Sequence, residues 1–154
     1  MERRIRNSAK ALVIHNGKML VSIINDNGDI FYILPGGGQE VEELLTDTVK
    51  RECAEEMGIL VEPKSLVFVV EGVHGESFHR IDLVFLCDYI GNIDNVEIQV
   101  DINQIGFEWI SIDNLLKEPL YPSKLRPQII NLFYNRKTEV YLGNESVGQS
   151  YNGE

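Results

Sequence analysis

The sequence predicts an α/β fold of the α+β kind, a sandwich in which helices pack on a mixed β-sheet. Runs rich in β-branched and aromatic residues lie on both sides of one long helical segment, and the 154 residues contain no internal repeat and no linker. This length is close to the commonest size of a single domain. We therefore expect one domain over residues 1–142 and a loose polar tail over 143–154.

The first part of the chain is typical of antiparallel β-structure. Two β-rich runs within residues 8–24 flank Asn16-Gly17, a strong signal for a tight hairpin turn. A second turn and a short strand are predicted within 25–34. Pro35 should end that strand, and the glycines that follow it allow backbone angles that other residues resist.

A helix of about four turns is predicted after the glycines. It should end near Met57, with Gly58 in the left-handed stop position. Its start is less well marked, because Leu44 occupies the place of a polar cap. At about 100° per residue, one apolar stripe faces the core, made of Leu45, Val49, Cys53 and Met57.

The rest of the chain combines further strands with two shorter helices. Strands are predicted at 65–72, 80–91 and 107–112, and helices at 111–118 and 126–136. A polar loop over 73–79 separates the first two of these strands. Ser111 or Asp113 is expected to cap the first of the two helices.

Composition narrows the classes of function. The formal net charge of -10 argues against a protein that holds nucleic acid by countering phosphate charge, whereas a small phosphorylated ligand fits if metal ions supply positive charge. Cys53 and Cys87 make one possible pair, too few for a disulfide-stapled domain. No run approaches about 18 consecutive apolar residues. We expect a soluble, cytoplasmic protein with reduced thiols and no membrane partner.

Glu52, Glu55 and Glu56 crowd the end of the predicted long helix. Like charges three or four residues apart repel at a cost of about 0.2–0.5 kcal/mol per pair. Glu52 and Glu56 also lie along the edge of the apolar stripe, where an unpaired charge is expensive. Clustered carboxylates beside a glycine-rich loop suit Mg²⁺ or Mn²⁺, so a bound metal is expected to offset the repulsion.

The segment from Gly37 to Ile59 resembles the complete Nudix box. The box has the form GX5EX7REUXEEXGU, in which U is a bulky apolar residue, and every specified position is filled, with Cys53 as a small member of the first U position. The resemblance extends to LPGG before the box and to FEWISIDNLLKEPLYPSKLRPQI after it, and covers about residues 6–135. The chain thus looks like a MutT-like Nudix hydrolase, and the resemblance implies an α/β/α sandwich with a long helix that carries the box.

The resemblance also implies a reaction. Nudix hydrolases cleave the diphosphate linkage of a nucleoside diphosphate derivative by water attack at phosphorus, with a divalent metal such as Mg²⁺ or Mn²⁺. Glu52, Glu55 and Glu56 are implied as metal ligands and catalytic residues, and Gly37 as the point where the backbone comes close to metal or phosphate. Arg51 is expected to support the loop and the ligand carboxylates through its fork of donors.

Further residues are candidates for binding substrate. Gly38 belongs to the same loop, and Glu40 occupies a place where the family often carries another acid near the metal. Arg6 is a candidate for a distal phosphate and His74 for the base or second moiety, although both are also compatible with a solvated surface position. The general base stays open, with Glu52 as first candidate, followed by Asp101, Glu97 and Glu108.

Two other functions and several substrates stay open. The chain could be a Nudix-like nucleotide sensor without chemistry, or a structural domain whose acids bind metal to stabilise the fold. Nucleoside triphosphates, ADP-ribose or nucleotide sugars, dinucleoside polyphosphates and capped RNA ends can share this box. Net charge favours a small-molecule nucleotide over RNA, and a homodimer is left open.

Overall fold

A computed structural model describes residues 3–95, 97–101 and 103–146. In these residues the elements are β1 (Ile5–His15), β2 (Lys18–Asp26), β3 (Asp29–Ile33), β4 (Gly36–Gly38), α1 (Leu45–Met57), β5 (Ile59–Gly72), β6 (His79–Asn92), β7 (Gln104–Ser111), the 3-10 helix η1 (Ile112–Lys117), α2 (Leu125–Phe133) and β8 (Tyr141–Asn144). Each predicted strand and helix has a counterpart among them. None of the helices in the described ranges is long and apolar enough to cross a membrane.

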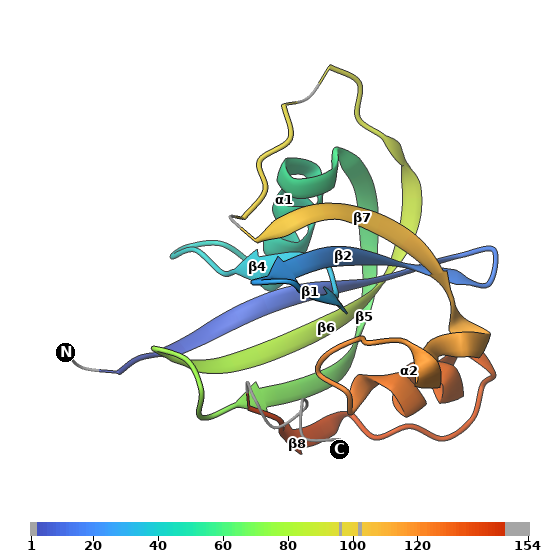
Figure 1. Ribbon diagram of the computed structural model, residues 1–154. Coiled ribbons are helices and arrows are strands. Elements are labelled where there is room, and N and C mark those ends of the chain that lie inside the picture. The colour runs from blue at the N-terminus through green and yellow to red at the C-terminus, as the bar shows by residue number, and fades with distance from the viewer. Residues whose placement is uncertain (1–2, 96, 102, 147–154) are drawn as a thin grey trace.

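The strands form a mixed sheet in the order β3-β2-β1-β6-β5-β8, while β4 pairs with β1 and β7 with β2. β1 runs parallel to β6 and antiparallel to β4, and β5 runs antiparallel to β6 (Figure 1). Asn16 and Gly17 connect β1 to β2 with φ of 53° and 72°, the positive angles that a tight hairpin turn requires. The predicted mixed sheet and the first hairpin are therefore confirmed.

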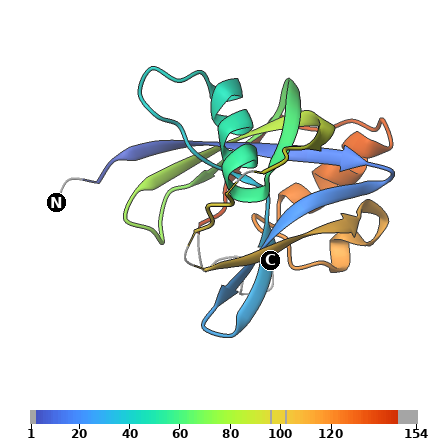
Figure 2. The ribbon, with the colours of Figure 1, turned by 90° about the horizontal axis from the view of Figure 1, so that it is seen from above.

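Alternate residues of the central strands face opposite layers, because side chains along a strand alternate between the two faces. Leu12 and Val84 pack in one core with residues of η1 and α2. Val13 and Phe85 pack in a second core with residues of α1. Figures 1 and 2 show α1 and α2 well apart, with the central strands between them. This arrangement is the predicted α/β/α sandwich.

Helix α1 ends as the sequence predicts. Gly58 adopts φ 63° and ψ 33°, and its N–H donates to the carbonyl oxygens of Ala54 and Cys53. Leu44 precedes the helix without a side-chain cap. The apolar stripe faces the second core, where Val49 and Cys53 are fully buried, and this burial raises the pKa of the Cys53 thiol.

Three local predictions are corrected by the structure. The glycines expected to form a loop pair with β1 as the short strand β4, because residues without side chains let the two backbones approach. Neither Ser111 nor Asp113 caps η1, which begins without a side-chain cap. The expected loose tail is ordered over residues 143–146, since β8 pairs with β5 and Glu145 is 3% exposed; residues 147–154 of that tail lie outside the described part of the chain.

Glu145 is buried because it caps α2. Its carboxylate accepts hydrogen bonds from the N–H groups of Ser123 and Lys124 and from the Ser123 hydroxyl. The first N–H groups of a helix have no partner within the helix. A carboxylate there satisfies those donors and complements the positive end of the helix dipole.

Candidate active site

Glycines bring the backbone of β4 against β1 and α1. Gly36 has φ 141°, and a Cβ at that position would lie 2.1 Å from the carbonyl oxygen of Ala9. A Cβ on Gly37 would lie 2.5 Å from the carboxyl carbon of Glu52. The missing side chain at Gly37 therefore leaves room for the Glu52 carboxylate directly beside the backbone.

Arg51 ties this loop to the acids of α1. Its guanidinium donates to both carboxylate oxygens of Glu43, at 2.7 and 3.0 Å, and to the carbonyl oxygen of Gly38 at 3.1 Å. It also donates to Glu52 at 2.9 Å and to Glu55 at 3.3 Å. The hydrogen bonds from Arg51 are the main reason why the pKa of Glu43 falls to about 2. One cation thus offsets much of the repulsion among the crowded acids.

Glu52 and Glu56 form a carboxyl pair. Glu56 is 6% exposed, and burial is the main cause that raises its pKa to about 9, followed by the hydrogen bond to Glu52 and the charge of that residue. Glu56 is therefore protonated at neutral pH and donates to Glu52. A proton shared by the Glu52 and Glu56 carboxylates therefore offsets their mutual repulsion, at the place where the sequence predicts a metal ion.

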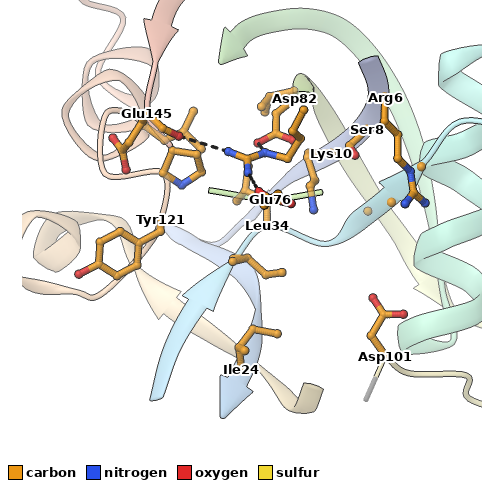
Figure 3. A pocket seen from close by; sticks show the side chains of 18 of the residues that line it. Arg6, Ser8, Lys10, Ile24, Leu34, Glu76, Asp82, Asp101, Tyr121 and Glu145 are labelled. Atoms are coloured by element: carbon orange, nitrogen blue, oxygen red, sulfur yellow. Dashed lines mark hydrogen bonds and ion pairs between the residues drawn. The ribbon is translucent and has the colours of Figure 1, made fainter. Parts of the chain in front are cut away.

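Glu56 lines a cavity of about 430 Å³, a volume in the range of small-molecule sites. The three glycines of β4 and Lys10 of β1 line the same cavity. Figure 3 shows Asp101 on the side of α1, and Tyr121 and Glu145 on the opposite side. The cavity therefore runs from the Nudix-like loop to the segments that precede and cap α2.

No three His, Cys, Asp or Glu side chains are placed to hold a metal ion in the described residues. Arg51 contacts Glu52 and Glu55, and Glu56 keeps its proton. The carboxylates of Glu52, Glu56 and Asp101 nevertheless fit a hard divalent cation. Glu52 and Glu56 are close enough to share the proton, and Asp101 lines the same cavity as Glu56. Metal binding would need loss of the Glu56 proton and rotation of Glu55, whose side chain is 41% exposed.

The structure brings only some of the predicted substrate residues to the cavity. Gly37, Gly38 and Arg6 line it. Glu40 is exposed, 3.9 Å from Arg51, and is not among the lining residues. His74 is also exposed and outside the lining. Its backbone N–H donates to the hydroxyl of Ser146, in the segment that follows β8.

The four candidates for the general base lie in different places. Asp101 lines the cavity, and the segment that carries it is fastened to α1 by a hydrogen bond of 2.6 Å from the Gln99 N–H to the carbonyl oxygen of Glu55. Glu97 is exposed, and Glu108 accepts a hydrogen bond from Tyr32. Glu52 is already engaged by Arg51 and Glu56.

Several residues that line the cavity are not among the predicted site residues, namely Lys10, Arg80, Asp82 and Gln104. A signal for two of them is present in the sequence. Lys10 precedes Leu12 by two residues, and Asp82 precedes Val84 by two, so each charged residue lies on the same face of its strand as an apolar residue that can be buried. A charge in phase with a buried face points to a functional or paired position.

A family model described as the NUDIX domain matches residues 5–144. The chain belongs to the Nudix family. Membership confirms that the chain is an enzyme, a Nudix pyrophosphohydrolase, and a family of this kind generally uses divalent metal ions. None of the curated proteins compared with this Nudix hydrolase matches it.

Solved structures share the fold of this Nudix hydrolase. The MutT protein from Methanosarcina mazei Go1 is 26% identical with a TM-score of 0.65, over 89% of this chain and 99% of that one. The E. coli ORF135 protein is 19% identical with a TM-score of 0.67, over 89% and 96% of the two chains. An ADP-ribose pyrophosphatase from Streptococcus suis 89-1591 is 20% identical with a TM-score of 0.62, over 91% and 98%.

Proposed function

We propose that this Nudix hydrolase cleaves the diphosphate linkage of a nucleoside diphosphate derivative. Water attacks phosphorus, and a nucleotide or phosphate leaves. The observation that carries the proposal is the position of Glu56, a box glutamate buried in the wall of a ligand-sized cavity beside the glycine strand. The names of similar structures, a MutT protein and an ADP-ribose pyrophosphatase, support the same class of substrate.

The residues around Glu56 take separate parts in this proposal. Mg²⁺ or Mn²⁺ held by Glu52, Glu55 and Glu56 would neutralise phosphate oxygens and lower the pKa of a bound water. Lys10 and Arg6 line the cavity and supply positive charge to the diphosphate.

Arg51 orients Glu52 through its hydrogen bond and holds the loop at Gly38. Asp101 is the better placed general base, because it lines the cavity while Glu52 is already engaged. Replacement of either acid by its amide should separate the two roles, since loss of the base removes the acidic limb of the pH–rate profile.

The test is hydrolysis of a panel of nucleoside triphosphates, nucleotide sugars and dinucleoside polyphosphates with Mg²⁺ or Mn²⁺. Glu56→Gln should keep the fold, because an amide has nearly the shape of the protonated carboxyl, and should lower kcat by at least about 100-fold, as expected for loss of one preorganised electrostatic group. Glu62→Gln is the matched control, since Glu62 is about half exposed and pairs only with Lys50 among the described residues.

Three results would overturn the proposal in different ways. Full activity of Glu56→Gln would remove Glu56 from the mechanism. Bound nucleotide without turnover of any substrate would favour the nucleotide sensor. A rise in melting temperature with metal, without binding of any nucleotide, would favour a structural metal site.

A further inference from the structure

A row of residues crosses the sheet on the floor of the cavity. Gly38 of β4 lies opposite Ser8 of β1, and Ser8 lies opposite Asp82 of β6. All three residues line the cavity. Neighbouring strands are about 4.8 Å apart, so Asp82 is about 10 Å from the glycine strand. A substrate with its diphosphate beside Glu56 would therefore meet Asp82 with a different group.

The charges around Asp82 disfavour a second phosphate there. Arg80 donates from Nε to Asp82 Oδ2 at 2.9 Å, from Nη1 to the Glu76 carboxylate, and from Nη2 to the carbonyl oxygen of Glu145 at 3.4 Å (Figure 3). One guanidinium thus faces two carboxylates, and the cluster has an excess of negative charge. Such a cluster repels anions and accepts a neutral group that can donate hydrogen bonds.

Asp82 has a free acceptor in this cluster. The side chain is 4% exposed, and Oδ1 has no hydrogen-bond partner within the described part of the chain. Buried acceptors are nearly always paired, because an unpaired one loses its hydration without compensation. Arg80 holds the other oxygen of the carboxylate, so Oδ1 has a fixed position. A donor on a bound ligand would complete its bonding.

The same cavity contains a buried donor of this kind. Gln104 is 7% exposed, and its Nε2 also lacks a hydrogen-bond partner among the residues described. Phe31, Phe78 and Tyr121 add flat apolar surface to the walls. A planar ring that carries both an N–H donor and an acceptor matches these walls, and a nucleobase has this chemistry.

We propose that Asp82 selects the nucleobase of the substrate. Its Oδ1 accepts a hydrogen bond from an N–H of the base, while Arg80 fixes the carboxylate. Gln104 Nε2 offers a second unpaired donor elsewhere in the same cavity, among the described residues. This inference rests on the proposed function, because it takes a nucleotide as the substrate.

The first experiment uses the wild-type protein and pairs of nucleotides that differ by one donor. ATP is compared with purine riboside triphosphate, GTP with both ITP and N1-methyl-GTP, CTP with zebularine triphosphate, and UTP with N3-methyl-UTP. For the preferred base, loss of the donor should lower kcat/KM by about 10- to 100-fold, the effect of one hydrogen bond to a charged group. Most of the change should fall on KM, because the contact is far from the reacting phosphorus.

The second experiment changes the acceptor. In Asp82→Asn the amide oxygen must face Arg80, since a guanidinium only donates, so the NH2 group takes the place of Oδ1. The preference for the donor-bearing nucleotide should then vanish or reverse, while the donor-free analogue keeps a kcat close to that of the wild type. Asp88→Asn is the matched control, because Asp88 is on the same strand, is 60% exposed and pairs with Lys64.

The outcomes of these two experiments separate failure of the Asp82 inference from failure of the proposed function. Hydrolysis with a kcat/KM ratio near one for all of these pairs overturns the inference and leaves the proposed function intact, as does a preference that survives in Asp82→Asn. If no nucleotide is hydrolysed, the proposed function fails by itself, and affinities for the same pairs measured by calorimetry still test Asp82.

Discussion

Replacement of Arg51 by methionine should destabilise the protein far more than the same change at the preceding residue, Lys50. Arg51 is 24% exposed and makes bonds of 2.7 to 3.3 Å to three glutamates. Lys50 is 43% exposed and lies 3.7 Å from Glu62. Both changes remove one positive charge from α1 and leave a side chain of similar length, so they differ mainly in burial and in hydrogen bonding.

The magnitude follows from these contacts. Loss of one partner from a largely buried charged network costs about 3 kcal/mol, whereas an exposed ion pair contributes about 0–1 kcal/mol. For a chain of this size 1 kcal/mol corresponds to a change in Tm of about 2–4 °C, so Arg51→Met should lower Tm by roughly 6–12 °C and Lys50→Met by roughly 0–4 °C. The decrease in Tm for Arg51→Lys should lie between these two values, because lysine keeps the positive charge but lacks the forked guanidinium donors.

The assay is differential scanning calorimetry of the metal-free protein at neutral pH. Equal changes in Tm for Arg51→Met and Lys50→Met would refute the reasoning, because they would show that the network around Arg51 adds no more than a surface pair. A smaller loss for Arg51→Met than for Arg51→Lys would also refute it. That result would mean that desolvation of a lysine ammonium at this position costs more than its hydrogen bonds return.

Three other predictions follow from the site. Gly36→Ala should unfold the protein, because the new Cβ would meet the backbone of β1, whereas Gly37→Ala should stay folded and lose activity, because its Cβ would meet the movable Glu52 side chain. Solubility and circular dichroism measure the difference, and two equally stable variants would contradict this prediction. Glu145→Gln should lower the free energy of unfolding by about 1–2 kcal/mol in urea, and an unchanged midpoint would show that the cap adds nothing. Binding of Mn²⁺ should release a proton from Glu56, whose pKa is about 9. The apparent affinity for Mn²⁺ should therefore rise by up to about tenfold per pH unit between about pH 6 and pH 8. Calorimetry in buffers of different ionisation enthalpy measures both the affinity and the released proton, and an affinity that falls as pH rises would contradict the prediction.

Local signals in the sequence predict much of the fold. Asn16-Gly17 predicts the first hairpin, and Gly58 predicts the end of α1, because each requires only its own backbone angle. The apolar stripe of α1 predicts which face is buried and places Glu56 at its edge. The box motif then identifies the family, which its match over residues 5–144 confirms.

The rest of the site depends on contacts between distant segments. Asp82 enters the cavity because β6 pairs in parallel with β1, and no residue near position 82 specifies that register. Glu145 looks like part of a polar tail until its carboxylate is placed at the start of α2. The proton shared by Glu52 and Glu56 depends on how deeply Glu56 is buried. A helical wheel shows toward which side of α1 a residue points, but it does not show how deep that residue lies.

The late position of β8 in the chain has a consequence for synthesis. Residues 141–146 emerge from the ribosome after β1, β4 and β6, and a domain generally folds as a unit. Until Glu145 emerges, the nascent chain has an uncapped α2 and a cleft that is open on that side. The cavity can therefore reach its final form only after almost all of the described chain has been synthesised.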